Sequence, residues 1–261
     1  MHSSSSSASF RFLGTGASAG VPVIGCSCVV CLSSSPYNKR LRPSGLLFVG
    51  EKKILIDAGP DLRMQALTAH ISGIDGLFLT HTHFDHIAGI DDLRAFYRKT
   101  GRPIPVLLSR ASYGELERRY HYLLEPGGSS AQLEWSLLPS DAGETSFLGL
   151  AVRYFTYQQG GMLVTGYRVG SFAYLTDIRD FPATIFSFLL GVRVLVIGAL
   201  CKEPTSLHFG FEEAVDFGKK VGAEEIFITH MNHTVDYEGT SNMLPPGVRL
   251  AYDGLEVSFG I

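Results

Sequence analysis

Short apolar runs separated by glycine-containing turns predict strands alternating with helices along the first half of the chain. The runs at 46–49 and 53–56 flank Gly50-Glu51 and predict a hairpin. The run at 76–80 is continuously apolar, which is typical of a strand buried on both faces, and it ends directly at His81. The remaining elements predicted in this half are a strand at 10–13 and a helix at 61–70.

The second half repeats this alternation. A strand at 225–228 leads into His230, and runs at 248–251 and 255–259 predict a closing hairpin around Asp253-Gly254. The other predicted strands are 106–109, 133–138, 150–157, 163–169, 172–175 and 194–197, and the predicted helices are 111–120, 183–190 and Phe211–Val221. Strands mixed with helices in both halves indicate layered α/β packing.

Length and composition favour one well-cored domain. The chain has 261 residues, of which 45% are hydrophobic and 18% charged. A net charge of −3 argues against nucleic-acid binding by bulk electrostatics. The sequence has no run of 18 apolar residues, so it predicts no membrane-spanning helix. The serine-rich residues 1–8 are expected to form a disordered tail rather than a secretory signal. We therefore expect a cytoplasmic protein.

Three of the four cysteines, Cys26, Cys28 and Cys31, lie within six residues. Disulfides within so short a stretch would be strained, so in a reducing compartment this cluster predicts a metal site. Cys201 stands alone in an apolar context, and we interpret it as a buried small hydrophobic residue.

Imidazoles and carboxylates gather in the segment His81-Thr82-His83-Phe84-Asp85-His86. His81 and His83 alternate and can project to the same side of an extended segment, while Asp85 and His86 turn back as the chain enters a helix at Ile87. Such ligands suit zinc, manganese and iron, and four of them in six residues can serve two adjacent metals. Gly89 follows at a position that predicts tight packing.

This segment resembles the signature of the metallo-β-lactamase superfamily. The resemblance implies an α/β fold, an αββα sandwich of two mixed β-sheets with helices on the outer faces. It implies a single domain at 9–261 with a cysteine-rich zinc loop inserted at about 20–35. Five further motifs resemble those of the PhnP-type phosphodiesterases, which act on a phosphoribosyl 1,2-cyclic phosphate: Gly14-Thr15-Gly16, Gly20-Val21-Pro22, the cysteine cluster, Gly59-Pro60-Asp61-Leu62-Arg63 and Tyr252-Asp253-Gly254-Leu255.

The resemblance also implies roles for individual residues. Asp57 would support the metal loop from behind, and His208 would be the acid that protonates the leaving oxygen. Asp85 and Asp177 are expected to take part in catalysis as metal ligands. The implied ligands are His81, His83 and Asp177 for a first metal, Asp85, His86, His230 and the bridging Asp177 for a second, and Cys26, Cys28, Cys31 and His233 for a structural zinc.

One position departs from the family pattern. A further histidine ligand of the first metal is expected seven residues before Gly166-Tyr167-Arg168, where this chain has Gln159. A glutamine oxygen is a weak, neutral ligand that suits manganese better than zinc. We therefore expect one or two active-site ions, Mn²⁺ or Zn²⁺, with a weakened rather than a lost first site.

The expected function is hydrolysis of a small phosphodiester, either cyclic or linear, through a metal-activated hydroxide. Hydrolysis of an acyl, lactone or thioester bond on the same metals is one alternative, and a degenerate, non-catalytic metal-binding protein is another because of Gln159. A small-molecule substrate is expected, without a membrane or nucleic-acid partner, and a homodimer is left open. Arg40, Arg42 and Arg63 could meet substrate phosphate or could be ordinary surface charges.

Overall fold

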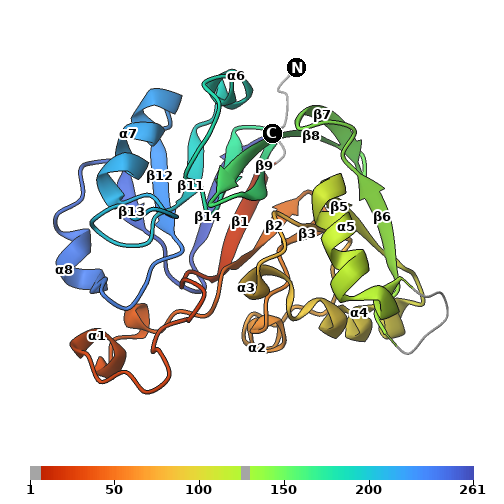
Figure 1. Ribbon diagram of the computed structural model, residues 1–261, viewed down its shortest axis with the longest axis horizontal. Coiled ribbons are helices and arrows are strands. Elements are labelled where there is room, and N and C mark those ends of the chain that lie inside the picture. Colours follow the sequence, from red (N-terminus) through yellow and green to blue (C-terminus); the bar gives the residue numbers. More distant parts are fainter. Residues whose placement is uncertain (1–6, 125–129) are drawn as a thin grey trace.

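Two seven-stranded β-sheets pack face to face in the computed structural model, which describes residues 7–124 and 130–261 (Figure 1). The first sheet has the order β14-β1-β2-β3-β4-β5-β6, and the second has the order β13-β12-β11-β10-β9-β8-β7. The strands of the first sheet are β1 (Ser7–Gly14), β2 (Ser44–Val49), β3 (Lys52–Ile56), β4 (Gly76–Phe78), β5 (Ile104–Leu108), β6 (Leu133–Leu137) and β14 (Glu256–Gly260). Those of the second are β7 (Ala142–Phe147), β8 (Leu150–Gln159), β9 (Met162–Val169), β10 (Phe172–Leu175), β11 (Val194–Gly198), β12 (Glu225–Thr229) and β13 (Val248–Leu250).

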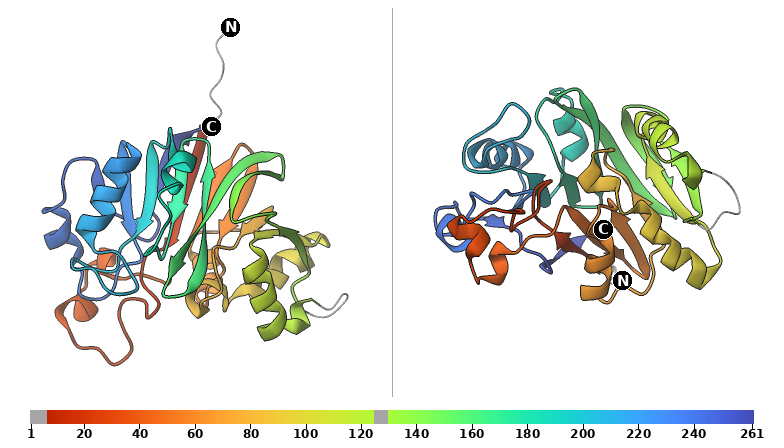
Figure 2. Two further views of the ribbon diagram at one scale, coloured as in Figure 1. Left: turned by 45° about the horizontal axis from the view of Figure 1, so that its top comes forward. Right: turned by 60° about the horizontal axis from the view of Figure 1, so that its bottom comes forward.

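Helices cover the outer face of each sheet, as the views in Figures 1 and 2 agree. The first sheet carries α2 (Leu62–Thr68), α3 (Phe84–Ile87), α4 (Arg94–Thr100) and α5 (Arg110–Arg119), and the second carries α6 (Ile185–Leu189), α7 (Phe211–Val221) and α8 (Tyr237–Ser241). A short helix, α1 (Val29–Leu32), lies in the cysteine-rich loop. The predicted αββα sandwich of two mixed sheets is confirmed.

The strands hold the layers together because their side chains alternate between two apolar interiors. In β2, Leu47 faces the space between the sheets and Leu46 faces the helices outside. The central layer is rich in aromatic rings, with the centroids of Phe10 and Phe172 only 4.8 Å apart across the two sheets. Each large apolar side chain removed from water contributes roughly 1.5–3 kcal/mol, so this layer is a main source of stability.

Parallel strands in both sheets bring the candidate metal ligands to the same end of the molecule. β3, β4, β5 and β6 run parallel in the first sheet, and β10, β11, β12 and β13 run parallel in the second. Residues that follow the carboxyl ends of parallel strands meet at one edge of a sheet. The residues expected to bind metal follow β4, β10 and β12, so the topology brings both sheets' contributions to the same end of the sandwich.

The predicted closing hairpin is wrong. β13 pairs with β12 in the second sheet, whereas β14 pairs with β1 in the first, so the chain crosses between the sheets at Asp253-Gly254. The carboxylate of Asp253 accepts hydrogen bonds from the backbone N–H and hydroxyl of Thr15, at 2.9 and 2.7 Å, and from the N–H of Leu41 at 2.7 Å. These bonds hold the crossing against the first sheet.

Other differences are local. β1 begins at Ser7, so residues 7 and 8, expected in the tail, belong to a strand, while residues 1–6 lie outside the described part of the chain. The helix after the histidine segment begins at Phe84 rather than at Ile87. β7, α1, α4 and α8 were not predicted, because each is short or has no clear apolar periodicity. In the described parts of the chain, none of the helices has both the length and the apolar character needed to span a bilayer.

Candidate metal centre

Sharp bends at the strand ends turn the candidate ligands inward. Asp57 follows β3 directly, His230 follows β12 directly, and Asp177 lies two residues beyond β10. All three adopt positive φ angles, of 59°, 63° and 53° respectively. Residues with a Cβ rarely adopt this conformation, which costs on the order of 1–3 kcal/mol each, so the surrounding contacts must hold it in place.

Asp57 is fully buried and supports the metal loop from behind, in the place expected from the sequence. Its carboxylate accepts hydrogen bonds from the N–H and the hydroxyl of Thr80, at 2.8 and 2.7 Å, and lies 2.7 Å from Nδ1 of His86. The bond to Nδ1 fixes the orientation of the imidazole and leaves its Nε2 directed into the site. Thr80 is the first residue of the motif that resembles the superfamily signature, but no role was predicted for it.

Close backbone packing holds the same loop. A Cβ at Gly59 would lie 2.0 Å from the carbonyl oxygen of Asp85, and a Cβ at Gly89 would lie 2.0 Å from the carbonyl oxygen of Gly59. Only glycine fits at either position, which confirms the tight packing expected at Gly89.

Asp177 lies between two groups of histidines. Its Oδ2 is 3.2 Å from Nε2 of His86, and its Oδ1 is 3.3 Å from Nε2 of His230. The hydroxyl of Thr176 donates to Oδ2 at 2.6 Å and fixes the carboxylate. Both imidazoles belong to the ligand set expected for the second metal, and the donor atom of His81, from the first set, lies within 4.8 Å of those of His86 and Asp177. Asp177 therefore lies next to both expected sets, as a bridging carboxylate would.

The other predicted ligands surround Asp177. Oδ2 of Asp85 lies 3.3 Å from Nε2 of both His86 and His230. On the opposite side, His81 groups with His86 and Asp177, and its Nε2 is 3.0 Å from Nδ1 of His83. The structure therefore brings all six predicted histidine and aspartate ligands of the active site together.

The donor set fits divalent cations. Nε2 of His86 is fully buried and has no hydrogen-bond partner among the described residues, although two carboxylates lie within 3.3 Å. A buried imidazole nitrogen in that setting is oriented as a ligand rather than as a hydrogen-bond donor. Two buried carboxylates with four neighbouring imidazoles need compensating positive charge, which bound cations would supply.

The electrostatics of the cluster keep its carboxylates charged. Burial favours the neutral form of Asp177, but neighbouring His230 and His86 outweigh it and hold the pKa of this carboxyl well below its usual value. Burial likewise opposes charge on His86, yet Asp85, Asp57 and Asp177 raise the pKa of its imidazole well above the ordinary value. The carboxylates therefore stay ionised and remain available as ligands.

Gln159 stands beside the bridging carboxylate rather than outside the site. It is 4% exposed, and its Nε2 lies 2.7 Å from Oδ1 of Asp177 and 3.2 Å from the ring of His208. Its Oε1 is buried without a hydrogen-bond partner among the described residues. Turning the amide by 180° would present this oxygen to the metal site, so Gln159 fits the weak, neutral ligand expected from the sequence.

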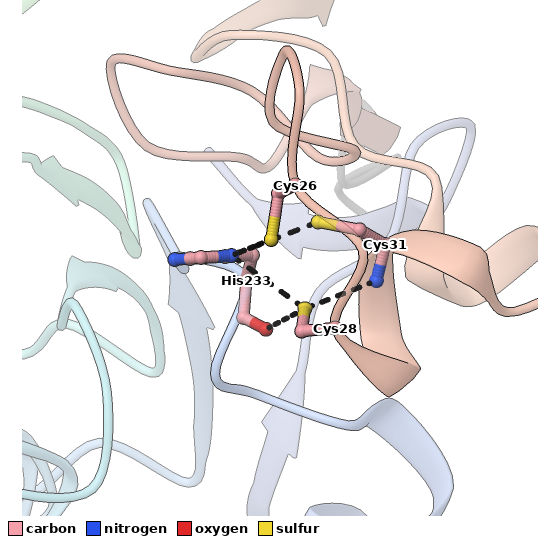
Figure 3. Close-up of side chains that lie close together, drawn as sticks. All are labelled: Cys26, Cys28, Cys31 and His233. Atoms are coloured by element: carbon pink, nitrogen blue, oxygen red, sulfur yellow. Dashed lines mark hydrogen bonds between the residues drawn. The ribbon is translucent and has the colours of Figure 1, made fainter.

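The cysteine cluster forms a second donor group (Figure 3). Nδ1 of His233 lies 3.2 Å from Sγ of Cys26 and 3.6 Å from Sγ of both Cys28 and Cys31. All four donor atoms lie within 4.8 Å of one another, and the cysteines are free thiols. Three thiolates and one imidazole at this spacing fit a tetrahedral zinc site.

Local contacts favour the thiolate form of Cys28. The N–H of Cys31 donates to Sγ of Cys28 and, with the neighbouring thiols, lowers the pKa of Cys28 to about 6 despite the opposing effect of desolvation. The apolar cluster of this loop contains only Val21, Val30 and Cys31 as buried members. So small a core would need a metal to hold the loop.

Two of the arginines considered as phosphate ligands have other partners. Arg40 is 1% exposed and donates to the backbone carbonyl of Val235 at 2.8 Å and to Oδ1 of Asn38 at 3.0 Å. Arg42 forms an ion pair with Asp61 at 3.0 Å. Arg63 is exposed on α2, and the structure does not bring it into the cluster. Cys201 is partly buried against the apolar core around α7, less than the sequence suggested.

Comparison with known proteins identifies the family. A family model described as a beta-lactamase superfamily domain matches residues 52–231. The chain belongs to the metallo-β-lactamase superfamily. A solved structure described as a new diphosphatase from the PhnP family is 35% identical, covers 97% of both chains and superposes with a TM-score of 0.90. The solved structure of human tRNase Z, short form, has the same fold. It is 18% identical to this chain and superposes on it with a TM-score of 0.72 over 97% of this chain.

A curated relative is longer. The octanoyltransferase of Porphyromonas gingivalis is 35% identical over 250 residues, which are 94% of this chain and 50% of the relative. This superfamily member thus spans half the length of that protein. Coenzyme PQQ synthesis protein B of Methylobacterium nodulans is 32% identical over 96 residues, which are 31% of this chain and 32% of the relative.

The cysteine site can be tested by removing one thiol. We expect Cys31→Ser to lose a tightly held zinc equivalent and to lower the unfolding temperature, because the loop has almost no other core. The matched control is Cys201→Ser, which removes a thiol outside the cluster. Elemental analysis and thermal unfolding would check both. A Cys31→Ser protein that keeps its zinc content would show that the four residues hold no structural metal.

The effect of Gln159 can be tested by restoring an imidazole. We expect Gln159→His to raise the active-site zinc affinity by about tenfold or more, because an imidazole replaces a neutral amide. Gln158→His is the control, since this neighbour on β8 is exposed. Calorimetric titration with Zn²⁺ and Mn²⁺ would measure the effect. Equal affinities in wild type and both variants would contradict a ligand position at residue 159.

Proposed function

We propose that this protein is a metal-dependent hydrolase whose substrate is a small phosphodiester. The observation that carries the proposal is the position of Asp177, which faces histidines on two sides and has His208 next to it. The 35% identity, over 97% of both chains, to a protein described as a diphosphatase of the PhnP family supports hydrolysis at a phosphoryl group, and the choice of a diester rests on the motifs that resemble the PhnP-type phosphodiesterases. The active-site residues described above would hold the metal ions.

Divalent cations, when bound, would lower the pKa of a coordinated water and offset negative charge on the phosphoryl oxygens. Hydrogen bonds within the chain already orient the candidate ligands. Asp57 and Thr80 orient His86, and Thr176 orients Asp177, so the ligands need little reorganisation when substrate binds.

In this proposal His208 protonates the leaving oxygen. Its Nδ1 lies 3.6 Å from Oδ1 of Asp177, and its side chain is 17% exposed, so it reaches both the cluster and the solvent side. The hydroxyl of Thr205 accepts a hydrogen bond from its backbone N–H at 2.9 Å and holds the loop. Burial and the nearby His230 lower the pKa of His208 to about 4. An anionic substrate beside the ring would raise this pKa and bring the acidic form nearer to neutral pH.

Acyl hydrolysis is the second candidate, because the matched half of a P. gingivalis protein belongs to an octanoyltransferase. The same donor set could polarise an ester or thioester carbonyl. The two candidates differ in the leaving oxygen or sulfur and in the charge of the reacting group, so a pair of substrates can separate them.

The first test compares bis(p-nitrophenyl) phosphate with p-nitrophenyl octanoate, which release the same chromophore. With Mn²⁺ or Zn²⁺ added, we expect metal-dependent release from the phosphodiester and little from the octanoate. Asp177→Asn is the inactive control, because it removes the carboxylate that both groups of histidines face. Faster metal-dependent cleavage of the octanoate would favour acyl hydrolysis, and no cleavage of either would favour a non-catalytic metal-binding protein.

The role of His208 can be separated from metal binding. We expect His208→Ala to lower kcat by about 10²–10⁴-fold, in the range of general acid catalysis, with metal content unchanged. Steady-state kinetics and elemental analysis of the same preparation would measure both quantities. Because His208 also lies within a donor group with Asp177 and His230, a parallel loss of metal would show that it is a ligand instead of the acid.

A further inference from the structure

The hairpin formed by β8 and β9 contacts both halves of the metal centre. The histidine segment, residues 81–86, follows β4 in the first sheet, whereas Asp177 follows β10 in the second. Two tyrosines of the hairpin, Tyr157 on β8 and Tyr167 on β9, are each 1% exposed. Their hydroxyls donate to backbone carbonyls at these two strand ends. Neither tyrosine is a candidate metal ligand.

Tyr157 holds the segment that carries Asp177. Its hydroxyl donates to the carbonyl of Thr176 at 2.6 Å, and both residues are buried, so water does not compete for this bond. Gln158, the next residue on β8, forms two backbone hydrogen bonds with Asp180, at 2.8 and 3.0 Å. β8 therefore fixes the chain on both sides of Asp177, whose φ of 53° needs such support.

Tyr167 holds the chain just before the histidine segment. Its hydroxyl donates to the carbonyl of Leu79 at 2.8 Å and lies 3.1 Å from the carbonyl oxygen of Leu107 on β5. On the same strand, the N–H of Thr165 donates to the carbonyl of Thr80 at 2.9 Å. Leu79 and Thr80 lie between β4 and the histidine segment. These bonds run from the second sheet to the first, beside the metal centre.

We propose that Tyr157 and Tyr167 are positioning residues, which set the spacing between Asp177 and the ligands of the histidine segment. The inference rests on the metal centre of the proposed hydrolase, whatever its substrate. Both expected ions take ligands from the histidine segment and from Asp177, so an error in this spacing weakens both. Groups that hold metal ligands from outside the coordination shell commonly change metal affinity about 10–100-fold when they are mutated.

Apolar packing alone does not explain the two hydroxyls. Both tyrosines belong to interior clusters in which phenylalanine would fill nearly the same volume, and the ring of Tyr167 stacks on that of Phe78 with centroids 4.7 Å apart. A buried hydroxyl is costly unless it has a partner. Here each partner is a carbonyl close to a metal ligand along the chain, which is where a positioning contact is needed.

Tyr154 offers a matched control on the same strand. It is also 1% exposed, but its hydroxyl lies 3.1 Å from Oγ of Ser140, which precedes β7. Along β8, Tyr154 is three residues, or about 10 Å, farther than Tyr157 from the end of the strand that faces the metal centre. Replacing it by phenylalanine removes an equally buried hydroxyl without touching either strand end that carries the ligands.

Metal affinity without substrate tests the proposal. Calorimetric titration with Mn²⁺ would use protein whose cysteine site is already filled with zinc, because manganese prefers carboxylates and imidazoles to thiolates. We expect Tyr157→Phe and Tyr167→Phe each to weaken Mn²⁺ binding about 10–100-fold. Tyr154→Phe should bind Mn²⁺ as the wild type does. Thermal unfolding of the same preparations would show that all four proteins are folded at the temperature of the titration.

A second readout separates positioning from a general loosening of the core. The electron paramagnetic resonance spectrum of bound Mn²⁺ reports its ligand geometry. At saturating Mn²⁺ we expect altered spectra for Tyr157→Phe and Tyr167→Phe, and a wild-type spectrum for Tyr154→Phe. Wild-type affinity and spectrum in either of the first two variants would overturn the role of that tyrosine.

Two further outcomes bear on the inference. An equal loss of affinity in Tyr154→Phe would overturn it, because the effect would then come from the loss of any buried hydroxyl. Wild-type protein that binds Mn²⁺ and shows the expected differences among the variants, but cleaves neither p-nitrophenyl ester, would uphold the positioning role while contradicting the proposed hydrolysis.

Discussion

Buried negative charge is the constraint around which this molecule is arranged. Asp57, Asp85 and Asp177 are 0%, 5% and 2% exposed, and carboxylates so far from water are costly unless positive groups and hydrogen bonds surround them. These three carboxylates are stabilised in two ways. Asp57 is satisfied by protein donors alone, whereas Asp85 and Asp177 face imidazoles whose nitrogens they share.

Asp57 therefore supports the site, whereas Asp85 and Asp177 would bind its cations. The Thr80–Asp57–His86 contacts are complete without a metal and can form as the first sheet forms. Asp177 accepts hydrogen bonds from Thr176 and Gln159, and Asp85 lies beside His230, but Nε2 of His86 is unpartnered next to both carboxylates, and a cation there would bind all three groups. The left-handed backbone of Asp57, Asp177 and His230 costs conformational energy, and it directs these side chains to one place.

The sequence predicted most of what local pattern controls. The apolar strands and the histidine segment were identified because strand periodicity and a dense run of histidines are local signals, whereas Asp177 and His230 were assigned as ligands through the resemblance to the superfamily. The destination of the strand at 256–260 was not, since Asp253-Gly254 has the appearance of a hairpin turn and only the distant Thr15 and Leu41 redirect it. Non-local hydrogen bonds of this kind leave no trace in a short window of sequence.

The surroundings of single residues were also hard to predict from the sequence. Arg40 looked like a surface charge or a phosphate ligand, yet it is buried and bonded to backbone carbonyls near the cysteine loop.

The pairing of β14 with β1 has a consequence for biosynthesis. β1 lies between β2 and β14, so during translation one edge of an early strand stays exposed until residues 256–260 have left the ribosome. The nascent first sheet would be prone to pairing with other chains throughout that interval, and a chaperone that shields the free edge of β1 would have most effect then.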